Sequence, residues 1–205
     1  MTGMMGEMAE RMPASAEAGA LLRDFGSWMA SEQKRIFLLC QRMLQDAEEA
    51  DSATQDAFLK AYQALKKANG PEVEDASRWI TRIAVNTCLD RLRSRKWQFW
   101  RRRPASEDEA AILDLTPETG PDAEERIFAR QIGSRIAAAL NALSARQRAV
   151  FTLRHFEDRT LEEIADILKL DVGTVKAHMF RAVSKLRQEL RDLYSGRGER
   201  KGGVA

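Results

Sequence analysis

Residues 161–190 constrain the fold of this chain more than any other stretch, because apolar residues recur at helical spacing on both sides of a short break. Before the break, one helical face is apolar: Leu161, Ile164, Ala165 and Leu168. After it, the apolar residues recur in steps of three and four: Val175, Met179, Val183, Leu186, Leu190 and Leu193. The break is too short for a structured loop, and Asp171 within it is a good N-cap. The stretch therefore predicts a helix, a tight turn and a second helix.

The opposite face of the second predicted helix is basic. It carries Lys176, His178, Arg181, Lys185 and Arg191. A helix with one face in a core and a basic face outward suits the major groove of DNA. An amphipathic hairpin with solvated charges has the same pattern, so this stretch by itself leaves both interpretations open.

The remaining periodic segments also indicate helices. They lie at residues 21–28, 31–44, 49–67, 77–95, 122–143 and 145–155. Ser144 is expected to cap the helix at 145–155, and Thr160 the helix that follows. No segment shows the alternation of a half-buried strand. We therefore predict an all-α fold with two small helical bundles.

The net charge of +2 conceals two neighbouring blocks of opposite sign. Residues 78–103 contain nine basic residues and one acid, whereas residues 104–125 contain eight acids and no basic residue. The first block favours contact with a polyanion, and the second avoids or mimics one. Residues 104–121 also contain three prolines, so we predict a flexible acidic linker there.

Several classes of protein are excluded by what the sequence lacks. No apolar run approaches the ~20 residues that a membrane span needs. Cys40 and Cys88 form no CxxC pair, and we expect both to be buried in a reducing cytosol. A Gly-rich phosphate loop, a nucleophile–base pair and a zinc-spaced cluster are all missing. We expect no enzymatic activity, cofactor, metal or small-molecule substrate, and a cytoplasmic location. Residues 1–20 and 195–205 are predicted to be a disordered lead-in and a flexible tail.

One face of the predicted helix at 77–95 has the side chains that unpaired DNA requires. That face is formed by Trp79, Arg82, Asn86, Asp90 and Arg93. A ring can stack on a base, an amide can bind a base edge, and guanidinium groups can bind phosphates. Trp79 fits a packed core equally well. The basic excess favours a nucleic-acid face for the cluster as a whole.

Three parts of the chain, in order, resemble the extracytoplasmic-function (ECF) group of bacterial sigma factors, in the sigma-70 family. The matching segments are 51–62 (DSATQDAFLKAY), 79–86 with 90–93 (WITRIAVN, DRLR), and 143–150 with 173–176 and 180–182 (LSARQRAV, GTVK, FRA). The family usually has Gly where this chain has Lys169. We expect Lys169 to adopt a positive φ, at a cost of about 1 kcal/mol.

The resemblance implies a region 2-like domain at 21–103 and a region 4-like domain at 122–194. The first would bind the β′ clamp of core RNA polymerase through its exposed side chains, Asp51, Gln55, Asp56 and Lys60, with Phe58 and Tyr62 in the core. It would open the −10 promoter element through Trp79, Arg82, Asn86, Asp90 and Arg93. The loop at 68–76 departs from the family pattern, so no −10 specificity is carried over through it.

The resemblance also implies that the second domain binds the β flap of polymerase and lays its last helix in the −35 element. The candidate contacts are Thr174, Lys176, His178, Arg181 and Lys185. The acidic linker would thread channels of the polymerase. A cognate anti-sigma factor is a further implied partner. Residues 97–103 (WQFWRRR) could extend the DNA face, contact polymerase or bind an inhibitor.

Two other functions compete with this one. A regulator that binds DNA alone through the helix-turn-helix would need a dimer interface or a sensor domain, and the chain has no spare segment for either. A protein that sequesters polymerase would leave the −10-like helix unexplained. The combination of three ordered segments favours a sigma factor that directs transcription initiation at promoters.

Overall fold

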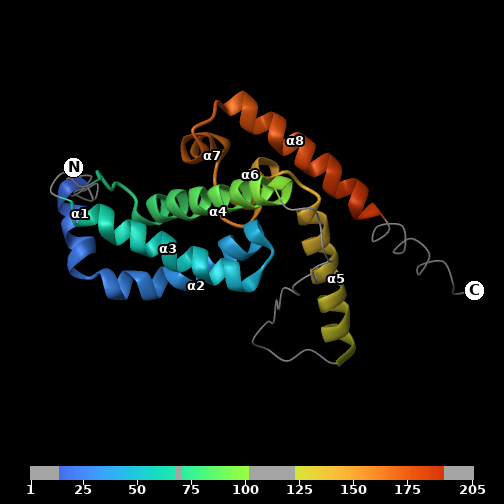
Figure 1. Cartoon of the computed structure of the whole chain (residues 1–205), viewed down its shortest axis with the longest axis horizontal. Coiled ribbons are helices and arrows are strands. Elements are labelled where there is room, and N and C mark those ends of the chain that lie inside the picture. Colours follow the sequence, from blue (N-terminus) through green and yellow to red (C-terminus); the bar gives the residue numbers. More distant parts are fainter. Residues whose placement is uncertain (1–13, 68–70, 102–122, 192–205) are drawn as a thin grey trace, which may run out of the picture.

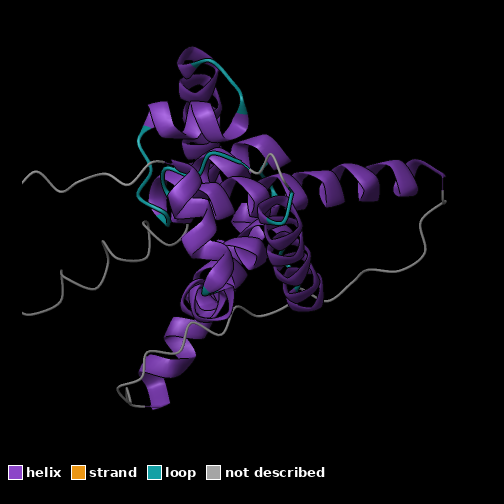
Figure 2. Ribbon diagram, turned by 90° about the vertical axis from the view of Figure 1, so that its left-hand side faces the viewer, coloured by secondary structure: helices purple, strands orange, loops and turns teal. Residues whose placement is uncertain are grey.

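The computed structural model describes residues 14–67, 71–101 and 123–191, and all regular structure in these ranges is α-helical (Figure 2). The helices are α1 (Ala14–Arg23), α2 (Phe25–Leu44), α3 (Ala47–Leu65), α4 (Ala76–Arg101), α5 (Ala123–Asn141), α6 (Ala145–His155), α7 (Leu161–Leu168) and α8 (Val172–Glu189). The all-α prediction is confirmed. No helix within these ranges is long and apolar enough to cross a membrane.

Helix α4 runs through the middle of the molecule, between the two groups of helices (Figure 1). On one side it packs against α2 and α3, with α1 at the far end. On its other side lie α6 and α7, and α8 follows α7 along the outside. Helix α5 extends away from the rest and contacts α8. The two helical groups are the two bundles that the sequence predicts.

The two bundles share one hydrophobic core. Ile36 and Leu39 of α2 and Ile80 of α4 are fully buried in the first bundle. The same cluster continues without a break into Leu153 of α6 and Ile164 of α7. A second cluster joins α5 to α8 and contains Leu140, Leu143, Ala182 and Leu186. The bundles are therefore packed against each other in this structure.

The predicted N-caps of the last three helices are confirmed. Ser144 accepts a hydrogen bond from the Gln147 amide at 3.4 Å, and the Gln147 side chain accepts one from the Ser144 amide. Thr160 and Glu163 form the same reciprocal pair, at 3.1 and 2.8 Å. Asp171 caps α8. These bonds satisfy amides that have no partner within the helix, so they determine where each helix begins.

The turn between α7 and α8 has the geometry that the sequence predicts. Lys169 adopts a φ of 51° in the left-handed region, which closes α7. The Leu170 amide then donates to the Ala165 carbonyl at 2.9 Å. A residue in this conformation at the end of a helix lets the next amides bond back to the last carbonyls of that helix.

The amino-terminal boundaries differ from the prediction. Helix α1 begins at Ala14, inside the segment predicted to be disordered, and α2 begins at Phe25 instead of residue 31. Phe25 and Trp28 pack against the core, and the Trp28 ring meets the Phe58 ring edge-on at 5.7 Å. These aromatic contacts extend α2 toward its amino terminus.

Several predictions lie wholly or largely outside the described residues. They concern the lead-in before residue 14, the linker at 104–121, the tail at 195–205 and the side chains of 97–103. One core prediction was wrong: Tyr62 is 37% exposed, although its ring meets Phe25 edge-on at 5.1 Å. Phe58, in contrast, is buried as expected.

The shared core predicts the effect of a cavity in α6. Leu153→Ala should lower the free energy of unfolding by about 2–5 kcal/mol, because it removes a fully buried side chain from the cluster that joins both bundles. Chemical denaturation would measure this. Leu59→Ala, at an exposed position, is the control and should change stability by less than about 0.5 kcal/mol.

Candidate nucleic-acid interface

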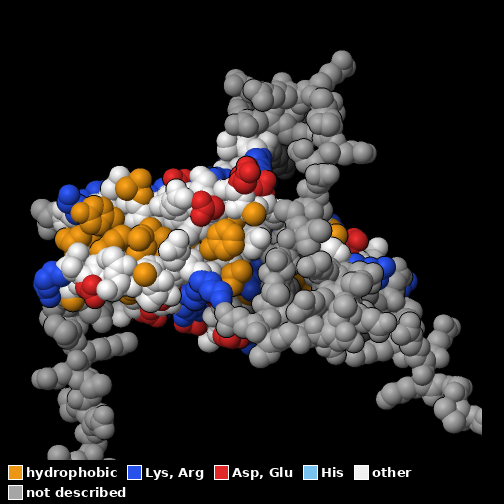
Figure 3. Space-filling model, turned by 90° about the horizontal axis from the view of Figure 1, so that it is seen from below, with side chains coloured by type: hydrophobic (Ala, Val, Ile, Leu, Met, Phe, Trp, Pro, Cys, Tyr) orange, Lys and Arg blue, Asp and Glu red, His pale blue; other side chains and the backbone are white. Residues whose placement is uncertain are grey.

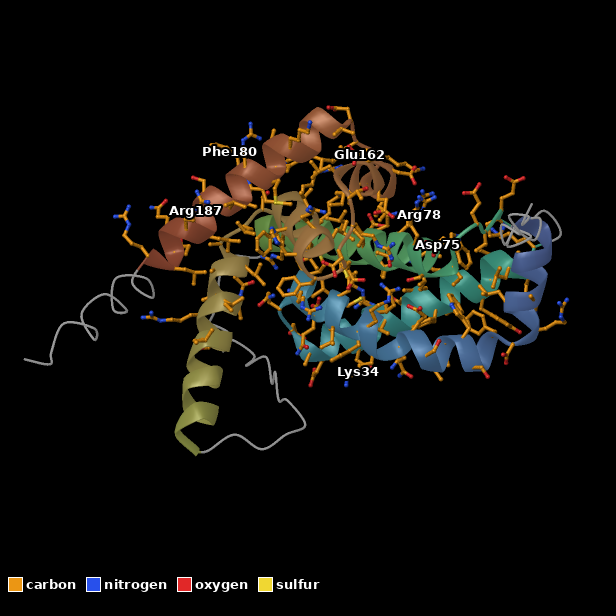
Figure 4. All side chains as sticks on the ribbon, turned by 180° about the vertical axis from the view of Figure 1, so that it is seen from behind. Lys34, Asp75, Arg78, Glu162, Phe180 and Arg187 are labelled. Carbon is orange, nitrogen blue, oxygen red and sulfur yellow. The ribbon has the colours of Figure 1, made fainter. Side chains whose placement is uncertain are left out.

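The outward face of α8 is basic and accessible. Lys176, Arg181 and Lys185 are exposed, whereas Val175 and Leu186 on the opposite face are buried. Figure 4 shows α8 along the outer edge of the molecule, with the labelled Phe180 and Arg187 on its outward side. Three of the five predicted −35 contacts therefore share one open surface.

Phe180 is a residue of this surface that the sequence-based site did not include. Its side chain is 76% exposed, more than any other large hydrophobic residue described. It borders a shallow hollow of about 430 Å³ together with Ser184 and Arg187. In the sequence, Phe180 was distinguished only by its place in the FRA segment at 180–182, which lies between the basic residues Lys176 and Lys185.

Thr174 is engaged in capping α8. Its amide donates to one carboxylate oxygen of Asp171 at 2.7 Å, and its hydroxyl donates to the other at 2.5 Å. These bonds, the hydroxyl bond first, lower the pKa of Asp171. Thr174 lies at the first turn of α8, where backbone amides and short side chains can approach a phosphate.

His178 differs from its basic neighbours. It is half-buried, and its Nδ1 is buried without a hydrogen-bond partner in the described part of the chain. Burial lowers the pKa of His178, and the charges of Arg181 and Arg146 lower it further. The ring is therefore neutral at pH 7 and can offer a hydrogen bond but no charge.

The five predicted −10 residues do not form one open surface. Asn86, Asp90 and Arg93 are exposed along α4, and the Arg93 guanidinium pairs with Asp90 at 3.2 Å. Trp79 packs against the core, nearly parallel to the Trp28 ring at a centroid distance of 6.4 Å. For Trp79, the structure favours the core position that the sequence left open.

Arg82 contacts the helix-turn-helix. Its Nη2 lies 2.6 Å from Asp166 Oδ2 of α7, and its Nε is buried without a partner among the described residues. The pair borders a hollow of about 270 Å³ at the start of α4, near Asp75 and Arg78 (Figure 4). In this structure, Asp166 therefore engages one end of the Arg82 guanidinium, and the Arg82 side chain stays 35% exposed.

The four predicted polymerase contacts on α3 divide into two pairs. Asp51 and Gln55 are exposed, and the Gln55 amide donates to Asp51 at 2.7 Å. Asp56 instead forms an ion pair with Arg91 of α4 at 2.5 Å. Lys60 is exposed but donates to a hydroxyl of α4, Thr87 Oγ1, at 3.0 Å.

An apolar groove of about 440 Å³ lies beside Asp51 and Gln55, between α2 and α3. Apolar side chains gather on this face, at the end of the molecule that holds α1 (Figure 3). Phe25, Met29 and Leu59 line the groove, and Leu59 is 54% exposed. Sequence periodicity did not indicate this groove, because its two walls come from different helices.

The cysteines are buried free thiols, as predicted. No cluster of His, Cys, Asp and Glu side chains in the described part of the chain is arranged to hold a metal ion. What the geometry offers is an open basic helix, a partly covered basic helix and an apolar groove with a polar rim.

Comparison with known proteins identifies the family. Residues 28–98 match the sigma-70 region 2 family, and residues 134–186 match the sigma-70 region 4 family. The ECF RNA polymerase sigma factor SigW of Bacillus subtilis is 30% identical over 160 residues, which cover 78% of this chain and 84% of SigW. The chain belongs to the sigma-70 family, in its ECF group.

Other relatives agree with this assignment. The RNA polymerase sigma-H factor of Pseudomonas aeruginosa is 31% identical over 183 residues and covers 83% of this chain and 88% of its own. Two solved structures share the fold. The sigma factor RpoE of Bartonella quintana, in complex with the anti-sigma factor NepR, has a TM-score of 0.61 at 19% identity and covers 82% of this chain and 98% of its own. CnrH, in complex with the cytosolic domain of CnrY, has a TM-score of 0.59 at 22% identity and covers 87% and 96%.

The capping carboxylates of α7 and α8 predict the response of this ECF factor to acid. Hydrogen bonding lowers the pKa of Glu163, chiefly from the Thr160 amide, and also that of Asp171. Each carboxylate therefore stabilises the fold fully above its unfolded pKa, and this stabilisation is lost as pH falls through the lower, folded pKa. Unfolding free energy should fall as the pH drops below about 4.5.

The measurement is chemical denaturation between pH 7 and pH 3. Asp171→Asn should flatten the pH profile, because asparagine can still accept the amide bond but does not titrate. Glu162→Gln, at an exposed site on α7, controls for the lost charge. An unchanged slope in Asp171→Asn would contradict the assignment.

Proposed function

We propose that this protein binds core RNA polymerase through its region 2 module and directs transcription initiation at promoters with −10 and −35 elements. The single observation that carries the proposal is the outward face of α8, where Lys176, Phe180 and Arg181 are open while the other face is buried. Core RNA polymerase is proposed as the partner because the chain belongs to the sigma-70 family.

Contacts at the −35 element follow from the chemistry of that face. Arg181 and Lys176 can donate to the O6 and N7 atoms of guanine, and each good contact discriminates by about 1–3 kcal/mol. Phe180 can contact a thymine methyl group. Lys185 lies farther along α8 and suits a phosphate. Thr174 and the neutral His178 add hydrogen bonds.

At the −10 element, the exposed strip of α4 is the first contact surface. The Asn86 amide can pair with adenine, and Arg93 can bind a phosphate, with Asp90 orienting its guanidinium. Trp79 and Arg82 join this surface only if their present contacts in the protein are exchanged for contacts with DNA.

The surface proposed for the polymerase clamp combines the rim of Asp51 and Gln55 with the apolar groove that Leu59 borders. Such a groove accepts the apolar face of an amphipathic helix, and the carboxylate favours a basic residue beside it. Asp56 and Lys60 contribute by holding α3 against α4.

Further partners follow from the family and the fold. A cognate anti-sigma factor is proposed because both similar solved structures are complexes with an inhibitory partner or a cytosolic partner domain. Action on promoters implies a cytoplasmic location. The proposed function needs no catalytic residue, cofactor or small-molecule substrate.

The decisive experiment is in-vitro transcription with purified core polymerase and a pool of genomic promoter fragments. Discrete start sites that require this protein would establish the function, and their alignment would give both promoter elements. Autonomous binding to duplex DNA without new start sites would indicate an ordinary regulator. Polymerase binding alone would indicate a sequestering protein.

The division of roles predicts separable defects. Lys176→Ala or Arg181→Ala should reduce promoter-specific transcription roughly 5- to 100-fold without weakening polymerase binding in a pull-down. Leu59→Asp should weaken the pull-down, because it places a charge in the apolar groove. Lys34→Ala, exposed on α2, is the control for loss of a positive charge. Equal loss of both activities in Arg181→Ala would refute the division.

A further inference from the structure

Two cysteine side chains meet in the core of the first bundle, although they lie far apart in the sequence. Cys40 belongs to α2 and Cys88 to α4, and both are fully buried in the same hydrophobic cluster. Their thiols are free and are hydrogen-bonded to each other. The proposed contacts with DNA and polymerase do not use them. Two facing thiols can form a covalent bond with each other, which a lone buried thiol cannot.

Packed helices offer the spacing that a disulfide requires, and α2 and α4 pack side by side (Figure 1). Helix axes in contact are about 8–10 Å apart, and each Cα atom lies about 2.3 Å from its axis, so facing residues have Cα atoms roughly 4–6 Å apart. Disulfides accept Cα separations of about 4.4–6.8 Å. The hydrogen bond between the thiols shows that Cys40 and Cys88 are such a facing pair.

The surroundings of the pair make the two thiols chemically different. The hydrogen bond from Cys88 lowers the pKa of Cys40 in spite of burial, and a hydrogen bond from Thr54 and the charge of Arg91 lower it further. The same bond between the thiols, together with burial, raises the pKa of Cys88. The thiolate is the nucleophilic form of cysteine. Cys40 is therefore the attacking thiol, and Cys88 stays protonated beside it.

Arg91 is held where its charge acts on the thiols. It follows Cys88 by one turn of α4 and is fixed by three acceptors on α3. Its Nη2 donates to Ser52 Oγ at 3.0 Å and pairs with Asp56 at 2.5 Å, and its Nη1 donates to the Glu49 carbonyl at 3.4 Å. A fixed cation beside a thiol favours the thiolate. The site thus combines two facing thiols with a positioned positive charge.

We propose that Cys40 and Cys88 are an oxidation site of this protein, at which hydrogen peroxide converts the two thiols into a disulfide that joins α2 to α4. The Cys40 thiolate attacks one peroxide oxygen and the O–O bond breaks, which leaves a sulfenic acid and a hydroxide that takes up the Cys40 proton as water. The Cys88 sulfur then attacks the Cys40 sulfur, and the S–O bond breaks. The hydroxyl leaves with the Cys88 proton as a second water. The thiols lose two electrons and the peroxide gains two.

Burial sets the rate of this reaction and directs its outcome. Peroxide is close to water in size and reaches the pair when the bundle opens locally. The reaction is therefore slower than at an exposed thiol of low pKa. The sulfenic acid forms beside its partner thiol, so condensation to the disulfide precedes further oxidation. The cross-link shortens the free chain of the unfolded state and should stabilise the first bundle.

The first experiment maps the bond in the full-length protein. The reduced protein is treated with hydrogen peroxide, remaining thiols are blocked with iodoacetamide in denaturant, and trypsin is added without reductant. Cleavage after arginine releases Cys40 in peptide 36–42 and Cys88 in peptide 83–91. We expect mass spectrometry to find these two peptides joined, and dithiothreitol to separate them. Methionine oxidation elsewhere does not alter this readout.

Single-cysteine variants test the order of the steps. After peroxide treatment with dimedone, Cys88→Ala should carry the sulfenic-acid adduct on Cys40. Cys88 in Cys40→Ala should be labelled about fivefold less or weaker still, because it lacks the lowered pKa. A thermal melt of each variant before treatment verifies that the bundle is folded.

The effect on stability is measured separately. Peroxide-treated wild-type protein should melt about 5 °C or more above the reduced protein, and dithiothreitol should reverse this gain. The double variant Cys40→Ala/Cys88→Ala, treated in the same way, is the control and reports any effect of methionine oxidation. It should show no gain.

Each outcome decides part of the proposal. Peptides 36–42 and 83–91 that stay separate after peroxide treatment, or that are joined only between two chains, would overturn the site. Stronger dimedone labelling of Cys88 than of Cys40 would overturn the assignment of the attacking thiol. A linked protein that melts no higher than the reduced one would overturn the stabilising role. These readouts need neither polymerase nor DNA, so they stand whether or not the transcription assay supports the proposed function.

Discussion

Burial of α4 on two sides is the constraint on which the rest of this structure depends. On one side of the helix, Ile80 and Cys88 pack in the core formed with α2 and α3. On the other side, α6 and α7 extend the same core. Only a narrow strip that includes Asn86 and Arg93 remains open to solvent. A helix held in this way is a rigid platform.

Arginine side chains make several of the polar contacts between the two modules, and others hold α3 against α4. Arg35 and Arg148 bind carbonyls and a carboxylate across the interface, and Arg82 pairs with α7. Arg91 and Arg95 pair with acids of the α3 segment, Asp56 and Glu49. The strongly basic block at 78–103 is therefore partly neutralised by the fold. Counting its charges along the sequence overstates what DNA would meet in this structure.

Local signals predicted the second module with most success. The caps at Ser144, Thr160 and Asp171 depend on hydrogen bonds that span three residues, so sequence spacing suffices to identify them. The left-handed conformation of Lys169 was expected from the resemblance, because the family usually has Gly at this position. The basic outward face of α8 follows from helical periodicity. Phe180 was not singled out, because a period assigns an aromatic side chain to a face without showing that the face is uncovered.

The sequence by itself determined most of the helices, the caps of the last three, the basic character of one face of α8 and the family, because each depends on residues within a few turns or on ordered segments. Only the tertiary structure decided that Trp79 packs against the core, that Tyr62 is partly exposed and that Arg82 is paired. It also revealed the groove beside Leu59, whose walls come from two helices. The physical reason is distance along the chain. Arg82 and Asp166 meet across 84 positions, and only the packing of the shared core brings them together.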